Sequence, residues 1–172
     1  MTIDYPDIAA LPASLQNAVT QRGSLNIFRM LMHTPGLAPG FLELAGAVLQ
    51  TNSLPAHLRE LAILRVGHVY AAAYEVHHHE NLARWAGLPH AAVIAAATGV
   101  TDGLPAEQAT ILTWTDQLLA NHTLTEEQRQ AALQSLTINQ LADLVITVGF
   151  YQLVCNFLNT FQVSTDGEGS PS

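Results

Sequence analysis

Lysine is absent from this sequence, and charge of either sign is scarce. The 172 residues include six arginines and 14 acidic residues, which gives a formal net charge of −8. Charged residues make up 12 % of the chain, against about 25 % in a typical soluble domain. Nucleic acids and anionic membrane surfaces are both bound through clusters of cations. The composition therefore predicts neither a nucleic acid nor a membrane as a partner.

Cysteine is nearly absent as well. With Cys155 alone the chain can form neither an internal disulfide nor a CxxC dithiol, and its apolar surroundings predict an inert packing role. The first residues carry no basic stretch ahead of an apolar block, and the longest apolar tract, 141–158, is interrupted by polar residues. We therefore expect no signal peptide and no membrane span, and a reducing cytoplasm as the compartment.

Strand signals are also missing. Alternating β-branched and aromatic runs joined by tight Asn-Gly or Asp-Gly turns do not occur. Apolar residues instead recur every three or four positions among Ala, Leu and Gln, which favour helices. The pattern predicts helices over 25–32, 41–49, 55–71, 73–86, 89–98 and 102–120, a short one capped by Thr125 and a long one from Thr137 to Phe161, with Ser53 as a further cap. We expect a single all-α domain, a helical bundle over residues 1–163, and a disordered tail over 164–172.

Apolar residues are abundant, at 49 % of the chain. Twenty charges are few for covering the surface of a monomer of this size. We therefore predict that part of the surface is a subunit interface, so that the protein is a homo-oligomer. The composition does not indicate the number of subunits.

The segment 59–88 concentrates the reactive polar residues. Glu60, Arg65, His68, Glu75 and His79 all lie there among Leu, Ile, Val and Ala, where a charge is costly to bury unless it is paired. Glu75 and His79 are four residues apart and share one helix face. A carboxylate beside an imidazole in an apolar setting is a usable proton-transfer pair. The alternative is a satisfied ion network that only fixes helix packing.

Three consecutive histidines, 77–79, raise the question of a metal site. Consecutive helical residues fan over about 200° of the helix surface, so they cannot all bind one ion. A mixed site is chemically possible, since carboxylates and imidazoles suit zinc or iron. Its ligands would be Glu60, His68, Glu75 and His79. No HExxH motif is present, so we expect no metal and no cofactor, with His77 and His78 solvated or at a subunit contact.

The central segment also shows a distinctive order of residues, namely Arg59–Val66, Tyr74–Val76, His79 and Ala83–Leu88. In this order it resembles the carboxymuconolactone decarboxylase family, which includes alkyl hydroperoxidase D. Two flanking stretches are similar to the family as well: Asn26–Arg29 followed by Pro35, and Val148–Tyr151 continuing to Phe157–Thr160.

The resemblance carries implications for chemistry and assembly. The peroxidase branch of the family has a Glu, then a CxxC, then a His four positions after the second Cys. On that spacing the two Cys positions fall on Ala72 and Glu75, so a dithiol peroxidase is effectively excluded, because the thiolate is the nucleophile. Glu60 and His79 keep the family's Glu and His. The resemblance implies the branch without CxxC and an AhpD-like all-helical fold, assembled as trimers or hexamers with the site near subunit contacts.

These observations predict a cofactor-independent lyase, decarboxylase or isomerase. Its substrate would be a small carboxylated lactone or a related ring acid. His79 and Glu75 would transfer the proton, and Glu60 would orient or tune His79. Donors near the developing enolate would stabilise it.

Substrate binding is assigned to a second group of residues. Arg65 would hold the substrate carboxylate by two parallel hydrogen bonds, and His68 and Tyr74 would complete the binding site. Two other functions stay open at this point. One is a non-catalytic oligomer that keeps the pocket for ligand binding, and the other is a metal-dependent enzyme.

Overall fold

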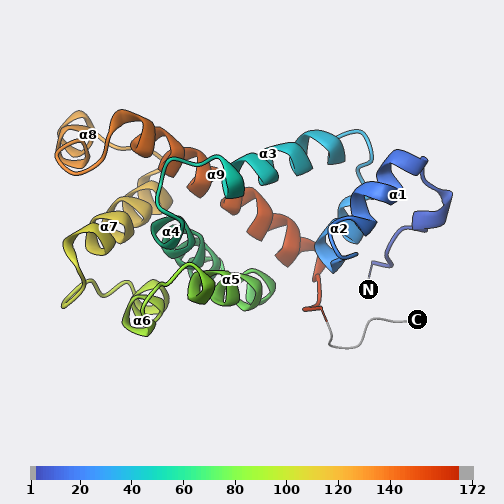
Figure 1. Ribbon diagram of the computed structural model, residues 1–172, viewed down its shortest axis with the longest axis horizontal. Coiled ribbons are helices and arrows are strands. Elements are labelled where there is room, and N and C mark those ends of the chain that lie inside the picture. Colours follow the sequence, from blue (N-terminus) through green and yellow to red (C-terminus); the bar gives the residue numbers. More distant parts are fainter. Residues whose placement is uncertain (1–2, 167–172) are drawn as a thin grey trace.

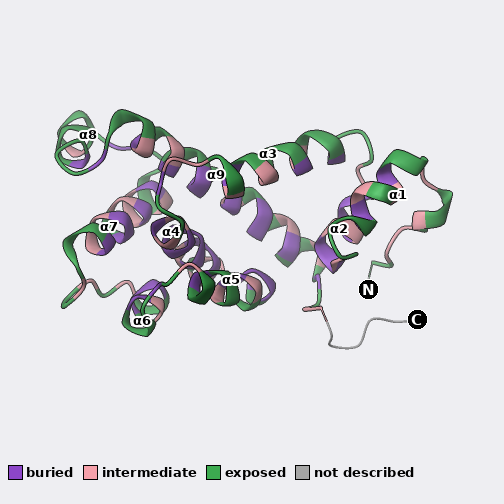
Figure 2. Cartoon of the chain, viewed as in Figure 1, coloured by how far each residue is buried: buried purple, intermediate pink, exposed green. Residues whose placement is uncertain are grey.

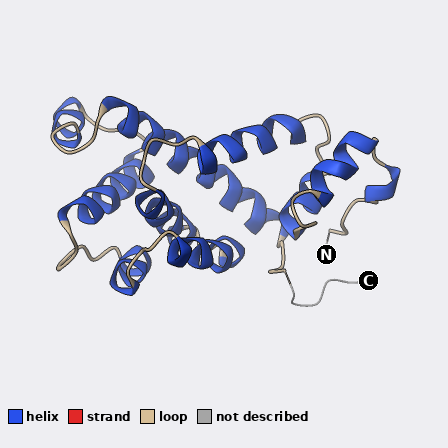
Figure 3. Cartoon of the chain, in the orientation of Figure 1, coloured by secondary structure: helices blue, strands red, loops and turns tan. Residues whose placement is uncertain are grey.

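The computed structural model describes residues 3–166, and within that range the chain forms only helices (Figure 1, Figure 3). The prediction of an all-α bundle is therefore confirmed. The elements are η1 (Ile8–Ala10), α1 (Ala13–Thr20), α2 (Asn26–Leu31), α3 (Ala38–Gln50), α4 (Ala56–Val69), α5 (Ala73–Trp85), α6 (His90–Thr98), α7 (Ala106–Asn121), α8 (Glu126–Ala132) and α9 (Ile138–Phe161).

Helix α4 occupies the centre of the bundle because it is apolar around most of its circumference, and such a helix is stable only when surrounded. It packs against α5, α6, α7 and α9 (Figure 1). Much of α4 is coloured purple for buried residues in Figure 2. The buried positions are Leu58, Glu60, Leu61, Ala62, Ile63, Leu64, Val66 and Gly67. Glu60 is the one charged group among them.

Helix α9 is the long apolar helix that the sequence predicted. By length and composition it could cross a membrane, but half of its most apolar window is buried inside the protein, where it packs against α3, α4 and α7. This is the place of a core helix. Its N-terminus is closed by a capping box between Thr137 and Gln140, and α8 begins with the same arrangement of Thr125 and Gln128. Both predicted caps are confirmed.

The first three α-helices form a smaller core of their own. It contains Leu15, Val19, Leu31, Met32, Ala38 and Leu42. Phe28, Phe41 and Phe157 pack against this cluster and against the main core as well. The α1–α3 unit thus lies against the ends of α5 and α9 through an aromatic seam, and this seam borders the site described below.

Some local features differ from those expected. Neither η1 nor α1 was predicted, and the third α-helix was expected to begin after Gly40, whereas α3 starts at Ala38 with Pro39 in its first turn, a position that suits proline. The predicted Ser53 cap is also wrong. Pro55 precedes α4 without a side-chain cap, because the Ser53 amide and hydroxyl both donate to Asp143 Oδ2, at 2.7 and 2.6 Å.

The first residues of the predicted C-terminal tail are ordered. Disorder was expected from Ser164, but Ser164 to Asp166 are held against the body of the protein. The Asn26 side chain donates to the Ser164 carbonyl at 3.0 Å, and the Asn26 amide donates to the Asp166 carboxylate at 2.8 Å. These contacts satisfy polar groups that a composition-based prediction does not consider. The rest of the predicted tail, 167–172, lies outside the described residues.

Candidate active site

The connection between α4 and α5 brings together residues that are distant in sequence. Helix α4 ends at Val69 and α5 begins at Ala73, with Ala71 in the left-handed region at φ 50°. The chain reverses there, and the two helices pack side by side. Gly67 allows the close approach, because a Cβ at that position would lie only 3.2 Å from a Val76 methyl group. Glu60 on α4 thereby comes to lie beside His79 on α5.

His79 lies between two carboxylates. Its Nδ1 is 2.6 Å from Glu60 Oε2, and its Nε2 is 2.8 Å from Glu75 Oε1. All three side chains are buried. An ionised carboxylate accepts hydrogen bonds but cannot donate them, so a ring facing a carboxylate at each nitrogen is best satisfied as a doubly protonated imidazolium. All three residues were predicted as site residues, and the structure brings them together.

The charge of His79 follows from a balance of two opposing effects. Burial alone lowers the pKa of His79, because it disfavours the charged ring. The charge of Glu75 and the hydrogen bond to Glu60 outweigh burial and raise the pKa of His79 to about 10. The ring is therefore positively charged at neutral pH. On the far side of Glu60, the Arg59 guanidinium lies 3.3 Å from Oε1 and balances the second carboxylate.

Glu75 has fewer polar partners than Glu60 among the described residues. Its Oε1 forms the ion pair with His79 but makes no hydrogen bond of good geometry within residues 3–166, and it is buried from solvent. A buried carboxylate oxygen without a hydrogen bond is costly. Among the described residues, the ion pair with His79 is therefore the contact that holds this oxygen.

Tyr151 of α9 completes the cluster and was not among the predicted site residues. Its hydroxyl is 3.3 Å from His79 Nε2, and the two rings meet edge to face. Burial and the neighbouring charge of Glu75 raise the pKa of Tyr151 well above its usual value, so the phenol stays neutral. Because a charged His79 carries a proton on Nε2, the Tyr151 oxygen accepts from it and keeps its own hydrogen free. No sequence spacing links positions 79 and 151.

A cavity of about 350 Å³ opens beside this cluster, between α2, α3, α5 and α9. Such a volume lies within the usual range for small-molecule sites. Glu75, His79 and Tyr151 form its polar wall, and Trp85, 89 % exposed, stands at its rim. The remaining lining is mainly apolar or aromatic, with Leu25, Ile27, Phe28, Phe41, Ala45, Leu49, Leu82, Phe150 and Val154.

Arg65 is not part of this site. Its guanidinium pairs with Asp116 of α7, at 2.6 Å from Nε to Oδ1, and donates to the Ala96 carbonyl of α6 at 3.1 Å. A Cβ at Gly99 would lie only 2.6 Å from Nη2 of the guanidinium. Arg65 thus ties α4, α6 and α7 together, and the prediction that it holds a substrate carboxylate in the pocket is wrong.

His68 also lies away from the cavity. It borders a separate shallow pocket together with Gly67, Ala71 and His77, because it points to the opposite side of the α4–α5 pair. Burial lowers its pKa, and Nε2 has no hydrogen-bond partner among the described residues. The prediction that His68 belongs to the same substrate site is therefore also wrong.

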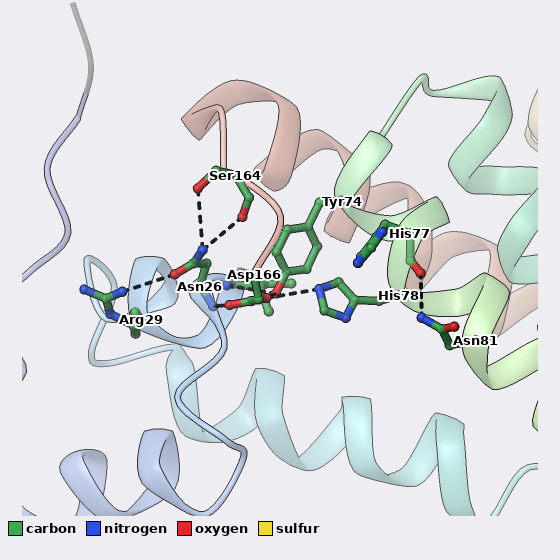
Figure 4. A network of polar contacts seen from close by, with 9 residues as sticks. Asn26, Arg29, Tyr74, His77, His78, Asn81, Ser164 and Asp166 are labelled. Atoms are coloured by element: carbon green, nitrogen blue, oxygen red, sulfur yellow. Dashed lines mark hydrogen bonds and ion pairs between the residues drawn. The ribbon is translucent and has the colours of Figure 1, made fainter. Parts of the chain in front are cut away.

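Tyr74 and His78 line the cavity at its α2 end, where a second polar network lies (Figure 4). The Tyr74 hydroxyl donates to Asp166 Oδ2 at 2.5 Å, and His78 Nε2 lies 3.0 Å from the same oxygen. The prediction for Tyr74 as a lining residue fits this position. His77 is exposed as expected, whereas His78 is half-buried and paired with Asp166, so His78 is not simply solvated.

Cys155 lies one turn beyond Tyr151 on α9. It is buried and free, and it does not belong to the cavity lining. Burial and the charge of Glu75 raise the pKa of its thiol, so the reactive thiolate is disfavoured. Among residues 3–166, no group of three or more His, Cys, Asp and Glu side chains has a geometry suited to a metal ion.

Residues 35–117 match the sequence profile of the carboxymuconolactone decarboxylase family. The resemblance to this family that the sequence indicated is therefore confirmed over that segment, which covers just under half of the chain. The match includes Glu60, Glu75 and His79, but it ends before α9 and therefore before Tyr151. A comparison with curated proteins found no match.

Solved structures share the fold over most of the chain. A peroxidase-related protein of uncharacterised function from Ralstonia eutropha JMP134, with an alkylhydroperoxidase AhpD core, superposes with a TM-score of 0.85 at 19 % identity, covering 96 % of this chain and 92 % of the other. A similar peroxidase-related protein from Silicibacter sp. TM1040 gives 0.82 at 15 % identity, covering 97 % and 92 %. A protein of unknown function from Agrobacterium tumefaciens gives 0.71 at 16 % identity, covering 80 % and 96 %. At these identities the likeness establishes the AhpD-like fold alone.

Proposed function

We propose that this protein is a cofactor-independent acid–base enzyme, a lyase or isomerase that moves a proton at a carbon beside the carbonyl group of a small ring compound. The observation that carries the proposal is the buried Glu75 side chain, which lines an apolar cavity and whose Oε1 lies 2.8 Å from Nε2 of the charged His79. A desolvated carboxylate in such a place is a competent general base.

The proposed reaction begins with a proton transfer to Glu75. The carboxylate takes the proton from the substrate carbon, and the electrons of the broken C–H bond move onto the carbonyl oxygen as an enolate. In an isomerase, Glu75 then returns the proton to a different carbon and the double bond shifts. The proton is conserved, so no oxidant, reductant or other reactant is needed.

The neighbouring residues stabilise the enolate. His79 places a positive charge beside Glu75, and Glu60 holds the ring from its other nitrogen at 2.6 Å. The neutral Tyr151 hydroxyl also lines the cavity and has a hydrogen to donate to the developing oxyanion, an interaction that is strong in a water-poor site. Glu60 acts through His79 and is therefore a positioning residue.

A thiol peroxidase reaction has little support in this chain. The sequence holds a single cysteine, which is buried and outside the cavity lining. Dithiol chemistry needs a second thiol and an accessible thiolate. The peroxidase-related names belong to the similar structures, whose identities to this chain are 19 % and 15 %.

The proposal is tested by hydrogen exchange in deuterated buffer. α-Angelica lactone, a five-membered enol lactone with an acidic ring CH₂ group, is incubated with the protein, and deuterium uptake and double-bond shift are followed by NMR. The wild type is expected to accelerate both, and Glu75→Gln to lose about 10²–10⁴-fold of that rate, the usual contribution of a general base. Glu80→Gln is the matched control, because Glu80 lies on the same helix outside the cavity lining. Equal rates in wild type and Glu75→Gln would contradict the proposal.

Tyr151→Phe tests the proposed hydrogen-bond donor to the enolate independently of the general base Glu75. The variant keeps the ring and loses only the hydroxyl, so we expect binding within about threefold of wild type. Removal of one oxyanion donor lowers rates by up to about 10²–10³-fold, and we expect a loss at or below the low end of that range. An unchanged exchange rate would remove Tyr151 from the mechanism and leave Glu75 in place.

A further inference from the structure

Within residues 3–166, the cavity lining contains no permanent cation. Lysine does not occur in the chain, and no arginine is among the described residues that line the cavity. A substrate carboxylate is normally held by Arg or Lys, because a buried anion without a partner is costly. This lining therefore lacks the group that the predicted carboxylated lactone would require.

Each of the six arginines has a contact elsewhere. These are Arg22 with the Ala18 carbonyl, Arg29 over the Tyr5 ring, Arg59 with Glu60, Arg65 with Asp116, Arg84 with Asn81 and Arg129 with the Leu124 carbonyl. Arg84 is adjacent in sequence to Trp85 and donates to Asn81 at 2.8 Å, and both of these residues line the cavity, but Arg84 itself borders a different surface pocket with Glu80 and His90.

The histidines of the lining do not replace an arginine. His79 is charged, but its two nitrogens already face Glu60 and Glu75 at 2.6 and 2.8 Å. A third carboxylate would place three anions around one imidazolium. His78 is turned to Asp166 at 3.0 Å, and burial lowers its pKa, so it is neutral at neutral pH.

The rest of the lining suits a flat, uncharged molecule. Phe28, Phe41, Trp85 and Phe150 present aromatic surface to the cavity, and such surface gains from covering an apolar ring. The acid–base pair of the lining is the Glu75 carboxylate and the Tyr151 hydroxyl, while Tyr74, His78 and Asn81 have partners within the protein. This pair suits a carbonyl group with an acidic neighbouring carbon.

We infer that the substrate is an uncharged ring carbonyl compound, a lactone or cyclic enone without a carboxylate. This inference rests on the function proposed above and narrows it. A substrate without a carboxylate has no carbon dioxide to lose. Of decarboxylation and double-bond isomerisation, isomerisation is therefore the reaction that remains. This inference differs from the carboxylated ring acid that the sequence predicted.

The test compares an acid with its own ester. The probes are the enol lactone that carries a carboxymethyl group in place of the methyl group of α-angelica lactone, and the methyl ester of that acid. Affinity is measured by calorimetry at pH 7.5 with the saturated counterparts, which have no double bond to move. Exchange is measured separately with the unsaturated compounds in deuterated buffer. We expect the ester to bind at least about tenfold more tightly than the acid, given the cost of burying an unpaired charge.

Adding a cation to the rim should reverse this preference. Leu82 is 40 % exposed and lines the cavity without belonging to the polar cluster, so Leu82→Arg supplies the missing partner on a site that tolerates a long side chain. We expect this variant to bind the acid at least as tightly as the ester. Leu82→Met is the matched control and should keep the preference of the wild type.

The outcomes separate the two proposals. Equal or tighter binding of the acid to wild type would overturn the inference, as would failure of both compounds to bind. Tighter binding of the ester without any exchange would support the inference about the ligand and overturn the acid–base function. Tighter binding of the ester together with exchange of its ring protons supports both.

Discussion

His78 and His79 are neighbours on α5, yet they belong to two different polar networks. His79 is fully buried between Glu60 and Glu75, and its pKa is raised to about 10. His78 is half-buried beside Asp166, and its pKa is lowered, mainly by burial. The same residue type thus becomes a charged group in one network and a neutral group in the other. The number of carboxylates in direct contact decides the outcome, since two overcome the cost of burial and one does not.

The two networks also differ in what they join. The His79 cluster connects α4, α5 and α9 inside the main core. The Asp166 network connects the end of the described chain to α2 and α5, because Asp166 accepts from the Asn26 amide, Tyr74 and His78 (Figure 4). One network therefore holds the reactive groups, and the other holds the α2 wall of the same cavity.

The largest expected effect is on catalysis and distinguishes the two histidines directly. His79→Gln should lower the rate of proton exchange by about 10²–10³-fold, because the positive charge that stabilises the enolate is lost. His78→Gln should stay within a few-fold of wild type. Exchange of the lactone ring protons in deuterated buffer gives both rates. Similar losses in the two variants would mean that the two networks do not differ in their part in the reaction.

The next effect is on stability at alkaline pH. The pKa of His79 in the folded protein, about 10, lies above the usual 6.5. The charged ring therefore contributes fully to the free energy of unfolding below about pH 6.5, and this contribution is lost as the pH rises through 10. A pKa that differs by one unit between the folded and the unfolded chain corresponds to about 1.4 kcal/mol. We therefore expect the free energy of unfolding of the wild type to decline by several kcal/mol as the pH rises. Urea unfolding between pH 6 and 10.5 measures it, and His79→Gln should flatten the curve. An NMR titration of the ring near pH 6.5 would contradict the assignment.

Loss of Asp166 should have a smaller effect. Asp166→Asn weakens three contacts of one partly buried carboxylate, and we expect a loss of about 1–3 kcal/mol in unfolding free energy. Tyr74→Phe should add little to it, because both changes remove the same hydrogen bond. Glu127→Gln on the exposed side of α8 serves as the control. Full additivity of the two changes would show that the Tyr74–Asp166 contact is not formed in solution.

The smallest effect is on stability at acidic pH. The pKa of His78 is lowered from 6.5 in the folded protein, so the unfolded chain binds the proton more readily and stability falls as the pH drops through 6.5. His78→Gln should reduce this fall in urea unfolding between pH 7 and 5.5, which is opposite in sign to the effect of His79. A steeper fall of stability in the variant would indicate that the charge of Asp166 outweighs burial in setting the pKa of His78.

Much of the helical framework could be predicted from local signals. The capping boxes at Thr125 and Thr137 and the breaks around Gly87 and Gly99 are visible in the sequence, because capping and left-handed turns depend on a few adjacent residues. The α1 helix was missed since its apolar positions are few. Ser53 was misassigned since its partner, Asp143, lies 90 residues away.

The candidate site was predictable only in part, for the same reason. Glu75 and His79 share one helix face by spacing, and Glu60 was a candidate because it is a charged residue in an apolar segment, which the resemblance to a family then supported. Nothing local places Tyr151 beside His79, Asp166 beside Tyr74, or Arg65 beside Asp116. Arg65 was assigned to substrate binding because a buried arginine needs an anion, but the anion belongs to the protein itself.

By itself the sequence determined the helical class, the long apolar helix α9 and the presence of a carboxylate–imidazole pair, because periodicity is a property of short segments. Tertiary structure decided which side chains face the cavity and which charges are already paired. Those outcomes depend on how α2, α3, α5 and α9 meet in space. The same six arginines could have bound an acid, but their contacts with other parts of the protein leave the described cavity lining without a permanent cation.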